Sequence, residues 1–206
     1  MSQDIKVILF DLGNVLVDFD YSFSVKRILN FCNKNPQELH DFFFTSGLTL
    51  LFEEGKITPE EFFNKVKEAL GLRISYEAFV PIWNEIFFLS AKNRAVYSLA
   101  NKLRLRYQVI LLSNINILHL EYLKKKFPVF NVFHRTFTSC ELGLIKPNPL
   151  IYRKVLEVLN VSADSVFYTD DRPELIKSAS ELGIQAFTFQ GINKLKDDLL
   201  SVGVTF

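Results

Sequence analysis

Short, almost wholly apolar segments alternate with helix-like segments along this 206-residue chain, and this alternation most constrains its fold. The apolar runs are short and rich in β-branched residues or Phe, which is typical of strands. They are Ile5–Phe10, Gln108–Leu112, Ser165–Tyr168 and Gln185–Phe189, with Arg135–Thr138 as a weaker fifth. Helical periodicity fills the segments Asn93–Leu105, Ile117–Lys126, Leu150–Leu159 and Glu174–Leu182. This order predicts an α/β fold, in which helices cover both faces of a parallel sheet.

The alternation is interrupted between the first strand and the second. This interval contains helix-like stretches at Pro36–Phe44, Pro59–Leu70 and Tyr76–Phe88. Thr58, followed by Pro59 and by Glu61 three positions on, has the pattern of a capping box with Pro at the first helical position. We therefore expect a small helical domain at residues 19–90, inserted into an α/β core that comprises residues 1–18 and 91–206.

The phenylalanines are concentrated in the predicted insertion. Twelve of the 21 lie between Phe19 and Phe88. A module this small needs ample apolar area to be stable, so these side chains predict a second, small core. Phe42–Phe44 and Phe52 are candidates for a further role at the mouth of a ligand site, where they would exclude water.

Composition narrows the functional classes. The chain has 24 basic and 23 acidic residues, which argues against a nucleic-acid-binding domain with its basic face. No segment approaches the roughly 18 apolar residues that span a bilayer. Cys32 and Cys140 form no CxxC pair, which favours two reduced thiols. We expect a soluble cytoplasmic protein that binds neither nucleic acid nor membrane, as a monomer or a homodimer.

Polar side chains follow the predicted strands at the point where each one ends. Asp11, Ser113, Asn114, Asp170 and Asp171 come directly after strands, and a loop delivers Lys146. The carboxyl ends of parallel strands share one edge of a sheet, which is where ligands bind in such folds. Carboxylates gathered at one edge repel each other unless a cation lies among them, and their oxygens suit Mg²⁺. With a hydroxyl and an ammonium beside them, they predict a Mg²⁺-dependent phosphate site.

Four segments, in this order, resemble the motifs of the haloacid dehalogenase superfamily of phosphohydrolases: FDLGNVL, LLSN, IKPNPLIY and YTDDRPELIKSASELG. Within that superfamily, DLGNVLVD, ELGLIKP and EEGKIT followed by EEF resemble the branch that contains the α-glucose-1-phosphate phosphatases. The resemblance implies a Rossmann-like core, with a helical cap inserted after the first strand. It also implies a phosphoric monoester hydrolase that acts on a small phosphorylated metabolite, such as a sugar phosphate.

The resemblance further implies a role for each motif residue. Asp11 is expected to be the nucleophile, which forms an aspartyl-phosphate, and also a Mg²⁺ ligand. The Gly13 carbonyl and Asp171 are expected to complete the metal site, with Asp170 supporting them. Ser113 and Asn114 are expected to bind the phosphoryl group, and Lys146 to neutralise its charge.

Two positions depart from the usual family pattern. Most of these phosphatases carry a second Asp, an acid and base, where this chain has Gly13. The expected consequence is low activity, or a preference for leaving groups that need little protonation. Asp18 and Asp20 are conceivable substitutes, although a structural or solvent-facing role is the default for such residues. The fourth motif often has Asn where this chain has Leu175, which bears on the surroundings of the metal.

Several functions remain compatible with these residues. A Mg²⁺-dependent phosphatase leads, and a catalytically weak protein that binds or senses a phosphorylated ligand is the alternative that Gly13 supports. A haloacid dehalogenase would use the same nucleophile without metal, and the pair Asp170–Asp171 disfavours it. A phosphoglucomutase-like transferase must pass protons both ways, which the missing second Asp disfavours. The sequence does not identify the substrate.

Overall fold

The computed structural model describes residues 4–206, and its centre is a five-stranded parallel sheet in the order β5-β4-β1-β6-β7. The strands are β1 (Val7–Phe10), β4 (Gln108–Ser113), β5 (Arg135–Thr138), β6 (Val166–Asp170) and β7 (Gln185–Thr188). The predicted strands and the α/β class are thus confirmed. β1 lies in the middle, with Phe10 opposite Leu111 of β4 and Thr169 of β6. The chain turns back across β1 after β5, so the strand order reverses beside the end of β1, where ligands bind in this architecture.

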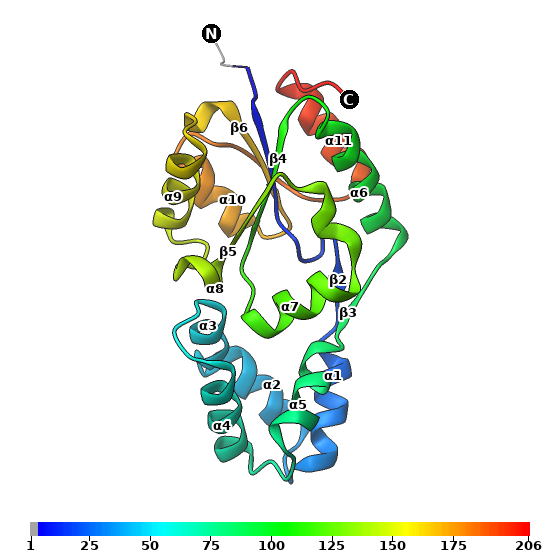
Figure 1. Ribbon diagram of the computed structural model, residues 1–206, viewed down its shortest axis with the longest axis vertical. Coiled ribbons are helices and arrows are strands. Elements are labelled where there is room, and N and C mark those ends of the chain that lie inside the picture. Colours follow the sequence, from blue (N-terminus) through cyan, green and yellow to red (C-terminus); the bar gives the residue numbers. More distant parts are fainter. Residues whose placement is uncertain (1–3) are drawn as a thin grey trace.

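Alternate residues of the central strands face different helical layers. Ile8 and Phe10 of β1 share one apolar cluster with residues of α6 and α11, while Val7 and Leu9 share another with residues of α9 and α10. Figure 1 shows these helices on the two sides of the sheet. The core helices are α6 (Ala91–Leu103), α7 (Ile117–Lys126), α8 (Ser139–Leu142), α9 (Pro149–Leu159), α10 (Pro173–Ser180) and α11 (Ile192–Ser201), with 3-10 turns at Pro128–Val132 and Ala163–Ser165.

The segment between β1 and β4 forms a helical lobe, here defined as residues 22–84, below the sheet in Figure 1. Its helices are α1 (Ser22–Ile28), α2 (Pro36–Thr45), α3 (Leu48–Glu53), α4 (Pro59–Leu70) and α5 (Tyr76–Asn84), with a 3-10 turn at Leu29–Phe31. The predicted capping box at the start of α4 is present, because the Thr58 side chain accepts from the Glu61 N–H and the Glu61 carboxylate accepts from the Thr58 N–H.

The lobe has the aromatic core that its phenylalanines predict. Phe52 stacks on Phe62 with ring centroids 4.4 Å apart, and Phe62 lies 4.9 Å from Trp83. Phe52 is fully buried in this core, so its proposed place at the mouth of a ligand site is wrong. Burial of these large rings supplies the apolar area that a lobe of this size requires.

A two-stranded antiparallel ribbon carries the chain into and out of the lobe. It pairs β2 (Asp18–Phe19) with β3 (Phe87–Phe88). The predicted helix Tyr76–Phe88 is therefore wrong at its C-terminal end: α5 stops at Asn84, and the following residues form β3 instead. The predicted limit between residues 18 and 19 falls within β2, whereas the limit between 90 and 91 falls after β3, at the start of α6. The division into two domains at those limits stays a prediction.

A close contact with α8 docks the end of α3 on the core. The Ser139 hydroxyl donates to the Glu53 carbonyl over 2.5 Å and accepts from the Ile115 N–H over 2.9 Å. At Gly55, a Cβ atom would lie 2.3 Å from the Cys140 carbonyl oxygen, so only glycine permits this approach. The lobe is thereby held over the carboxyl edge of the sheet at α8.

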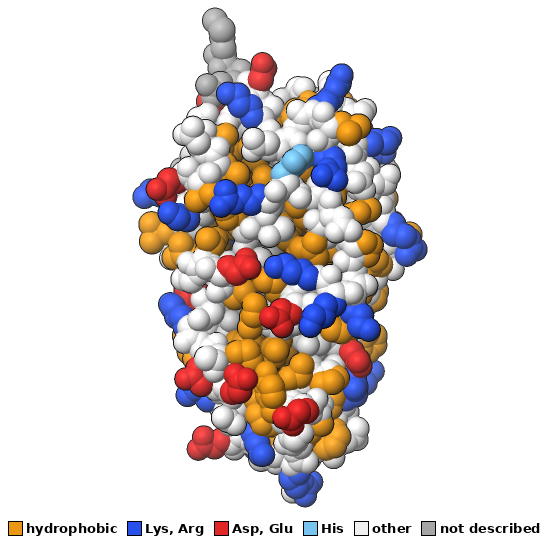
Figure 2. Space-filling model, viewed as in Figure 1, with side chains coloured by type: hydrophobic (Ala, Val, Ile, Leu, Met, Phe, Trp, Pro, Cys, Tyr) orange, Lys and Arg blue, Asp and Glu red, His pale blue; other side chains and the backbone are white. Residues whose placement is uncertain are grey.

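Charges are mixed on the surface. Lys and Arg side chains are interspersed with Asp and Glu on the face shown in Figure 2, and hydrophobic side chains gather over the lobe. None of the helices within residues 4–206 has both the length and the apolar character required to cross a membrane.

Two glycine substitutions measure the docking contact. Gly55 and Gly71 both have positive φ, +69° and +62°, but a Cβ at Gly71 meets nothing within 4 Å. Gly71→Ala should cost about 1–2 kcal/mol of unfolding free energy, from backbone strain alone. Gly55→Ala should cost about 1–3 kcal/mol more, because the α8 backbone must move. Urea denaturation of both variants checks this, and equal losses would contradict the docking role of Gly55.

Candidate active site

Three carboxylates meet at the carboxyl edge of the sheet. Asp11 follows β1, Asp170 ends β6, and Asp171 comes next. One oxygen from each lies within 4.8 Å of the others. The sequence predicted this meeting, since β1 and β6 pair in parallel and their carboxyl ends lie side by side.

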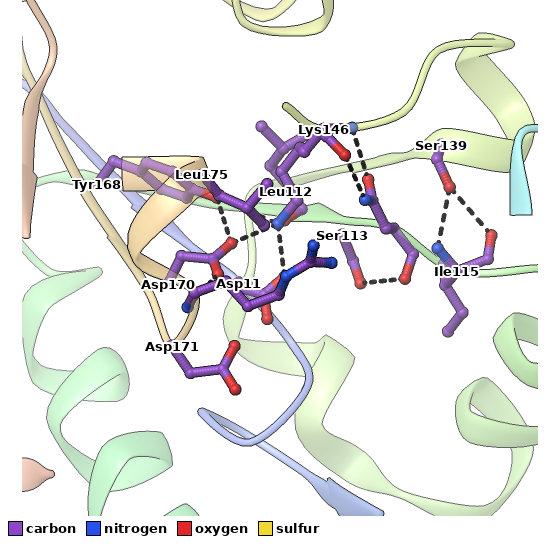
Figure 3. A network of polar contacts seen from close by, with 12 residues as sticks. Asp11, Leu112, Ser113, Ile115, Ser139, Lys146, Tyr168, Asp170, Asp171 and Leu175 are labelled. Atoms are coloured by element: carbon purple, nitrogen blue, oxygen red, sulfur yellow. Dashed lines mark hydrogen bonds and ion pairs between the residues drawn. The ribbon is translucent and has the colours of Figure 1, made fainter. Parts of the chain in front are cut away.

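The Lys146 ammonium lies between two of these carboxylates, as Figure 3 shows. Its Nζ is 2.7 Å from Asp11 Oδ1 and 2.6 Å from Asp170 Oδ2, and it also donates to the Leu112 carbonyl and to the Tyr168 hydroxyl. The Lys146 side chain is 1% exposed. A buried ammonium is stable only where such partners surround it, so this network fixes the lysine at one place.

The electrostatics of the cluster favour added positive charge. Burial raises the pKa of Asp11 to about 7; Lys146 opposes this rise, while Asp170 and Asp171 add to it. Burial alone would lower the pKa of Lys146, but Asp11 and Asp170 together raise it above its usual range. Burial also raises the pKa of Asp171, against the hydrogen bond from Asn14. One ammonium therefore does not balance three carboxylates.

The three carboxylates differ in how many bonds they already make. Asp170 accepts from Lys146 and Tyr168 at one oxygen and from the Arg172 N–H at the other, and it is fully buried. Asp171 accepts from the Asn14 side-chain amide, over 2.8 Å. Asp11 and Asp171 therefore keep oxygens that could hold a cation, while Asp170 is arranged to hold Lys146.

The donor set fits magnesium. Carboxylate oxygens, with a backbone carbonyl such as that of Gly13 at the same pocket, are hard ligands of the kind that Mg²⁺ prefers. Gly13 lines the pocket beside Asp11. The roles of Asp11, Gly13, Asp170 and Asp171 in metal binding stay predictions.

Ser113 and Asn114 have different surroundings. The Ser113 hydroxyl makes only a long contact, 3.4 Å, to the Asn114 carbonyl, so it can turn toward a phosphoryl oxygen. The Asn114 side chain instead accepts from the Lys146 N–H and donates to the Lys146 carbonyl, both over 2.9 Å. These two bonds position Lys146; Asn114 also lines the pocket, and its role in substrate binding stays a prediction.

A pocket of about 350 Å³ opens over the cluster, between the sheet edge and the lobe. Its aromatic wall comes from the ribbon and the lobe: Phe19, Tyr21, Phe43, Phe44 and Phe87. Its polar lining away from the cluster includes Glu53 and Arg172. Phe43 and Phe44 thus lie where the sequence predicted a wall, whereas Phe42 is not among the lining residues. The volume suits a small metabolite.

His119 ties α7 to the lobe at the pocket wall. Its Nε2 lies 3.1 Å from the Trp83 carbonyl and its Nδ1 lies 3.0 Å from the Asn116 side-chain amide. A neutral ring that donates at Nε2 and accepts at Nδ1 satisfies both contacts. Burial lowers the pKa of His119 to about 4, although the Trp83 carbonyl opposes the shift. His119 is therefore a buried, neutral ring that packs at the pocket wall.

Sequence reasoning missed several contacts that support the site, both inside and outside the four motifs. Tyr168 and Asn14 stand inside motif segments, but nothing in the spacing indicates their hydrogen bonds. Glu53 belongs to the EEGKIT segment, which was noted only for its likeness to a family branch. Leu175 lines the pocket with an apolar side chain, while its carbonyl accepts from the Tyr152 hydroxyl.

Comparisons with known proteins agree with this geometry. A protein-family model described as haloacid dehalogenase-like hydrolase matches residues 5–183. A D-ribitol-5-phosphate phosphatase from Bacteroides thetaiotaomicron is 27% identical over 189 residues, which cover 89% of this chain and 91% of that protein.

Solved structures give the same result. A haloacid dehalogenase family enzyme from Bacteroides thetaiotaomicron, in complex with magnesium and inorganic phosphate, superposes with a TM-score of 0.79 at 32% identity, covering 89% of this chain and 93% of that one. A hydrolase of the same fold from Porphyromonas gingivalis has a TM-score of 0.82 at 23% identity over 98% of this chain and all of that one, a likeness in fold.

The neutral His119 makes stability depend on pH. In the unfolded chain the pKa of this imidazole is near the ordinary histidine value of 6.5, whereas in the folded protein it is about 4. Between these values the unfolded state binds more protons, so lowering the pH removes roughly 3 kcal/mol of unfolding free energy. In His119→Gln this loss should be absent, and the stability difference between wild type and variant should shrink by that amount from pH 7 to pH 4. Urea titrations check it, with the exposed His40→Gln as control; a constant difference would contradict the prediction.

Proposed function

This chain belongs to the haloacid dehalogenase-like hydrolase family, and from that premise we propose that it is a Mg²⁺-dependent phosphatase that hydrolyses a small phosphorylated metabolite. One observation carries the proposal. A buried nucleophile candidate, Asp11, stands beside two further carboxylates and a buried ammonium, at the floor of a pocket. Such a cluster can bind a cation and a phosphoryl group together.

The proposed reaction proceeds through an aspartyl-phosphate. An Asp11 oxygen attacks phosphorus, the bond from phosphorus to the substrate oxygen breaks, and water later hydrolyses the acyl phosphate to restore the carboxylate. Lys146 holds Asp11 in place and offsets the negative charge of the phosphoryl oxygens. The Ser113 hydroxyl donates to one of these oxygens. Asp11 and Lys146 are held by their mutual contact before the substrate arrives, which lowers the reorganisation that the reaction needs.

Magnesium, when bound by Asp11, Asp171 and the Gly13 carbonyl, would supply the positive charge that lets two anions approach each other. The excess of carboxylates over ammonium groups, and the pKa of Asp11 near 7, support a cation at this position. The carboxylate must be ionised to attack, and a bound divalent cation favours that form.

The pocket supports a substrate of metabolite size. The relatives of this chain include a phosphatase named for D-ribitol 5-phosphate, which supports a sugar-alcohol or sugar phosphate as the substrate class to test first. Aromatic side chains form much of the wall, and they can pack against the carbon face of such a molecule. Cytoplasmic location and a monomeric or homodimeric state remain part of the proposal.

Metal dependence gives the first test. Purified protein with Mg²⁺ should hydrolyse p-nitrophenyl phosphate and at least one member of a panel of sugar, sugar-alcohol and acyl phosphates, and EDTA should remove the activity. Released phosphate is measured colorimetrically, and activity should return with excess Mg²⁺. Turnover that EDTA leaves intact, or binding of phosphate without any turnover across the panel, would refute the proposal; the second result would favour a ligand-binding protein.

Replacement of the nucleophile gives the second test. Asp11→Asn should lower kcat by about 10³-fold or more, because the amide has the same shape but is a far poorer nucleophile. Asp197→Asn removes an exposed carboxylate and is the matched control, which should keep full activity. Circular dichroism establishes that both variants fold. Substantial activity in folded Asp11→Asn would mean that another residue attacks phosphorus.

A further inference from the structure

A phenylalanine ring stands where a side chain at position 13 would begin. A Cβ atom on Gly13 would lie 2.9 Å from Phe19 Cε1 and 3.8 Å from Asp11 Oδ2. The wall beside Asp11 is therefore closed by an aromatic ring, and position 13 holds no acid. Asp18 does not replace it, because its carboxylate is bound by Lys92 over 2.7 Å and by the Asn93 amide over 3.1 Å and is not among the pocket-lining groups.

The pocket has one more carboxyl group within the described chain, that of Glu53. The other three lining acids are the clustered Asp11, Asp170 and Asp171, which the proposed chemistry already uses. Glu53 ends α3, so it reaches the pocket from the lobe rather than from the sheet. Figure 1 shows α3 beside α8, facing the carboxyl edge of the sheet.

This position is on the side where the leaving group departs. In phosphoryl transfer the attacking and leaving oxygens lie roughly in line through phosphorus. Asp11 attacks from the sheet edge, so the leaving oxygen points away from the sheet and toward the lobe. A group on α3 is placed on that side, whereas the Lys146 ammonium is bound to Asp11 and Asp170.

The main chain at Glu53 is held firmly enough to place its side chain. The Glu53 carbonyl accepts from Ser139, and Gly55 lies against the Cys140 carbonyl, so both ends of this short turn contact the core. A general acid must first be positioned within reach of the oxygen that it protonates, and its pKa matters only once that condition is met.

The surroundings of Glu53 also keep a proton available. Burial raises the pKa of its carboxyl to about 7, and the positive charges of Arg172 and Lys146 only partly oppose the shift. Tyr21 lines the same side, and burial together with Glu53 raises its pKa well above its usual value, so it stays neutral. Both the acid and the base form of Glu53 are therefore populated near neutral pH.

We propose that Glu53 is the general acid that protonates the leaving-group oxygen, in place of the side chain that position 13 lacks. The inference rests on the proposed phosphatase function. As the bond from Asp11 to phosphorus forms, the bond to the substrate oxygen breaks, its electron pair goes to that oxygen, and the Glu53 proton neutralises it as an alcohol. Ionised Glu53 then takes a proton from the water that attacks phosphorus. The bond between the Asp11 oxygen and phosphorus breaks, its electron pair restores the Asp11 carboxylate, and inorganic phosphate leaves.

Leaving-group dependence tests this role. The alkyl phosphate with the highest kcat/KM in the panel needs a proton on its leaving oxygen, whereas p-nitrophenolate leaves p-nitrophenyl phosphate without one. Glu53→Gln should lower kcat/KM for the alkyl phosphate by about 10²–10⁴-fold, and should change kcat/KM for p-nitrophenyl phosphate by only a few-fold. This ratio reports the steps up to phosphorylation of Asp11, so the later hydrolysis does not obscure it.

Two further variants separate catalysis from structure. Glu60→Gln removes an exposed carboxylate of the same lobe and should leave both substrates unchanged. Glu53→Asp keeps the acid but withdraws it by one methylene, and should recover part of the lost alkyl-phosphate activity.

The outcomes are distinct. Equal losses on both substrates in Glu53→Gln, or no loss on the alkyl phosphate, would overturn the role of Glu53 while leaving the phosphatase proposal intact. Wild-type protein inert toward both substrates would refute the phosphatase proposal itself, and this inference with it.

Discussion

The contact of the buried Lys146 ammonium with Asp11 and Asp170 is the interaction on which the rest of the site depends. A charge in the interior must be paired and hydrogen-bonded, and removing one partner of such a pair typically costs about 3–5 kcal/mol. The surrounding residues meet this demand. The Asn114 side chain hydrogen-bonds both the backbone N–H and the backbone carbonyl of Lys146. The Tyr168 hydroxyl donates to the same Asp170 oxygen that the lysine contacts. Asp11, the nucleophile candidate, is thus held in place by a charge pair that the folded protein must keep intact.

The sequence predicted the positions of the residues at the sheet edge well, because the same local pattern recurs at each strand. Each buried strand ends where its apolar run ends, and parallel pairing then brings Asp11, Ser113 and Asp170 to one edge. The contacts that each of these side chains makes could not be predicted from spacing in the same way. Asn114 follows a strand as Ser113 does, yet its amide is committed to Lys146, a contact across 32 positions that only the folded loop creates.

The lobe was less predictable for physical reasons that differ by element. The capping box and apolar periodicity of α4 are strong local signals, and its bounds match the predicted ones. β2 and β3 have two residues each, too few to show a period, and Phe87–Phe88 continued the apolar stripe of α5. Glu53 reaches the pocket only because Gly55 permits a close approach to Cys140, and a single glycine in a loop does not indicate what lies opposite it.

Core and lobe therefore divide the charges of the pocket between them. The core supplies fixed groups of opposite sign around the position of attack, where charge must be balanced before the reaction begins. The lobe supplies aromatic side chains and one carboxyl group; in the proposed reaction, charge appears on this side only as the leaving group departs. Gly13 and Phe19 connect the two arrangements: the ring fills the space that an acid at position 13 would need, so an acid can serve the reaction only from the opposite wall. A site that combines Gly13 with Phe19 has to obtain its leaving-group proton from the lobe or from the solvent. The source of this proton therefore determines which leaving groups, and so which substrates, the site can accept.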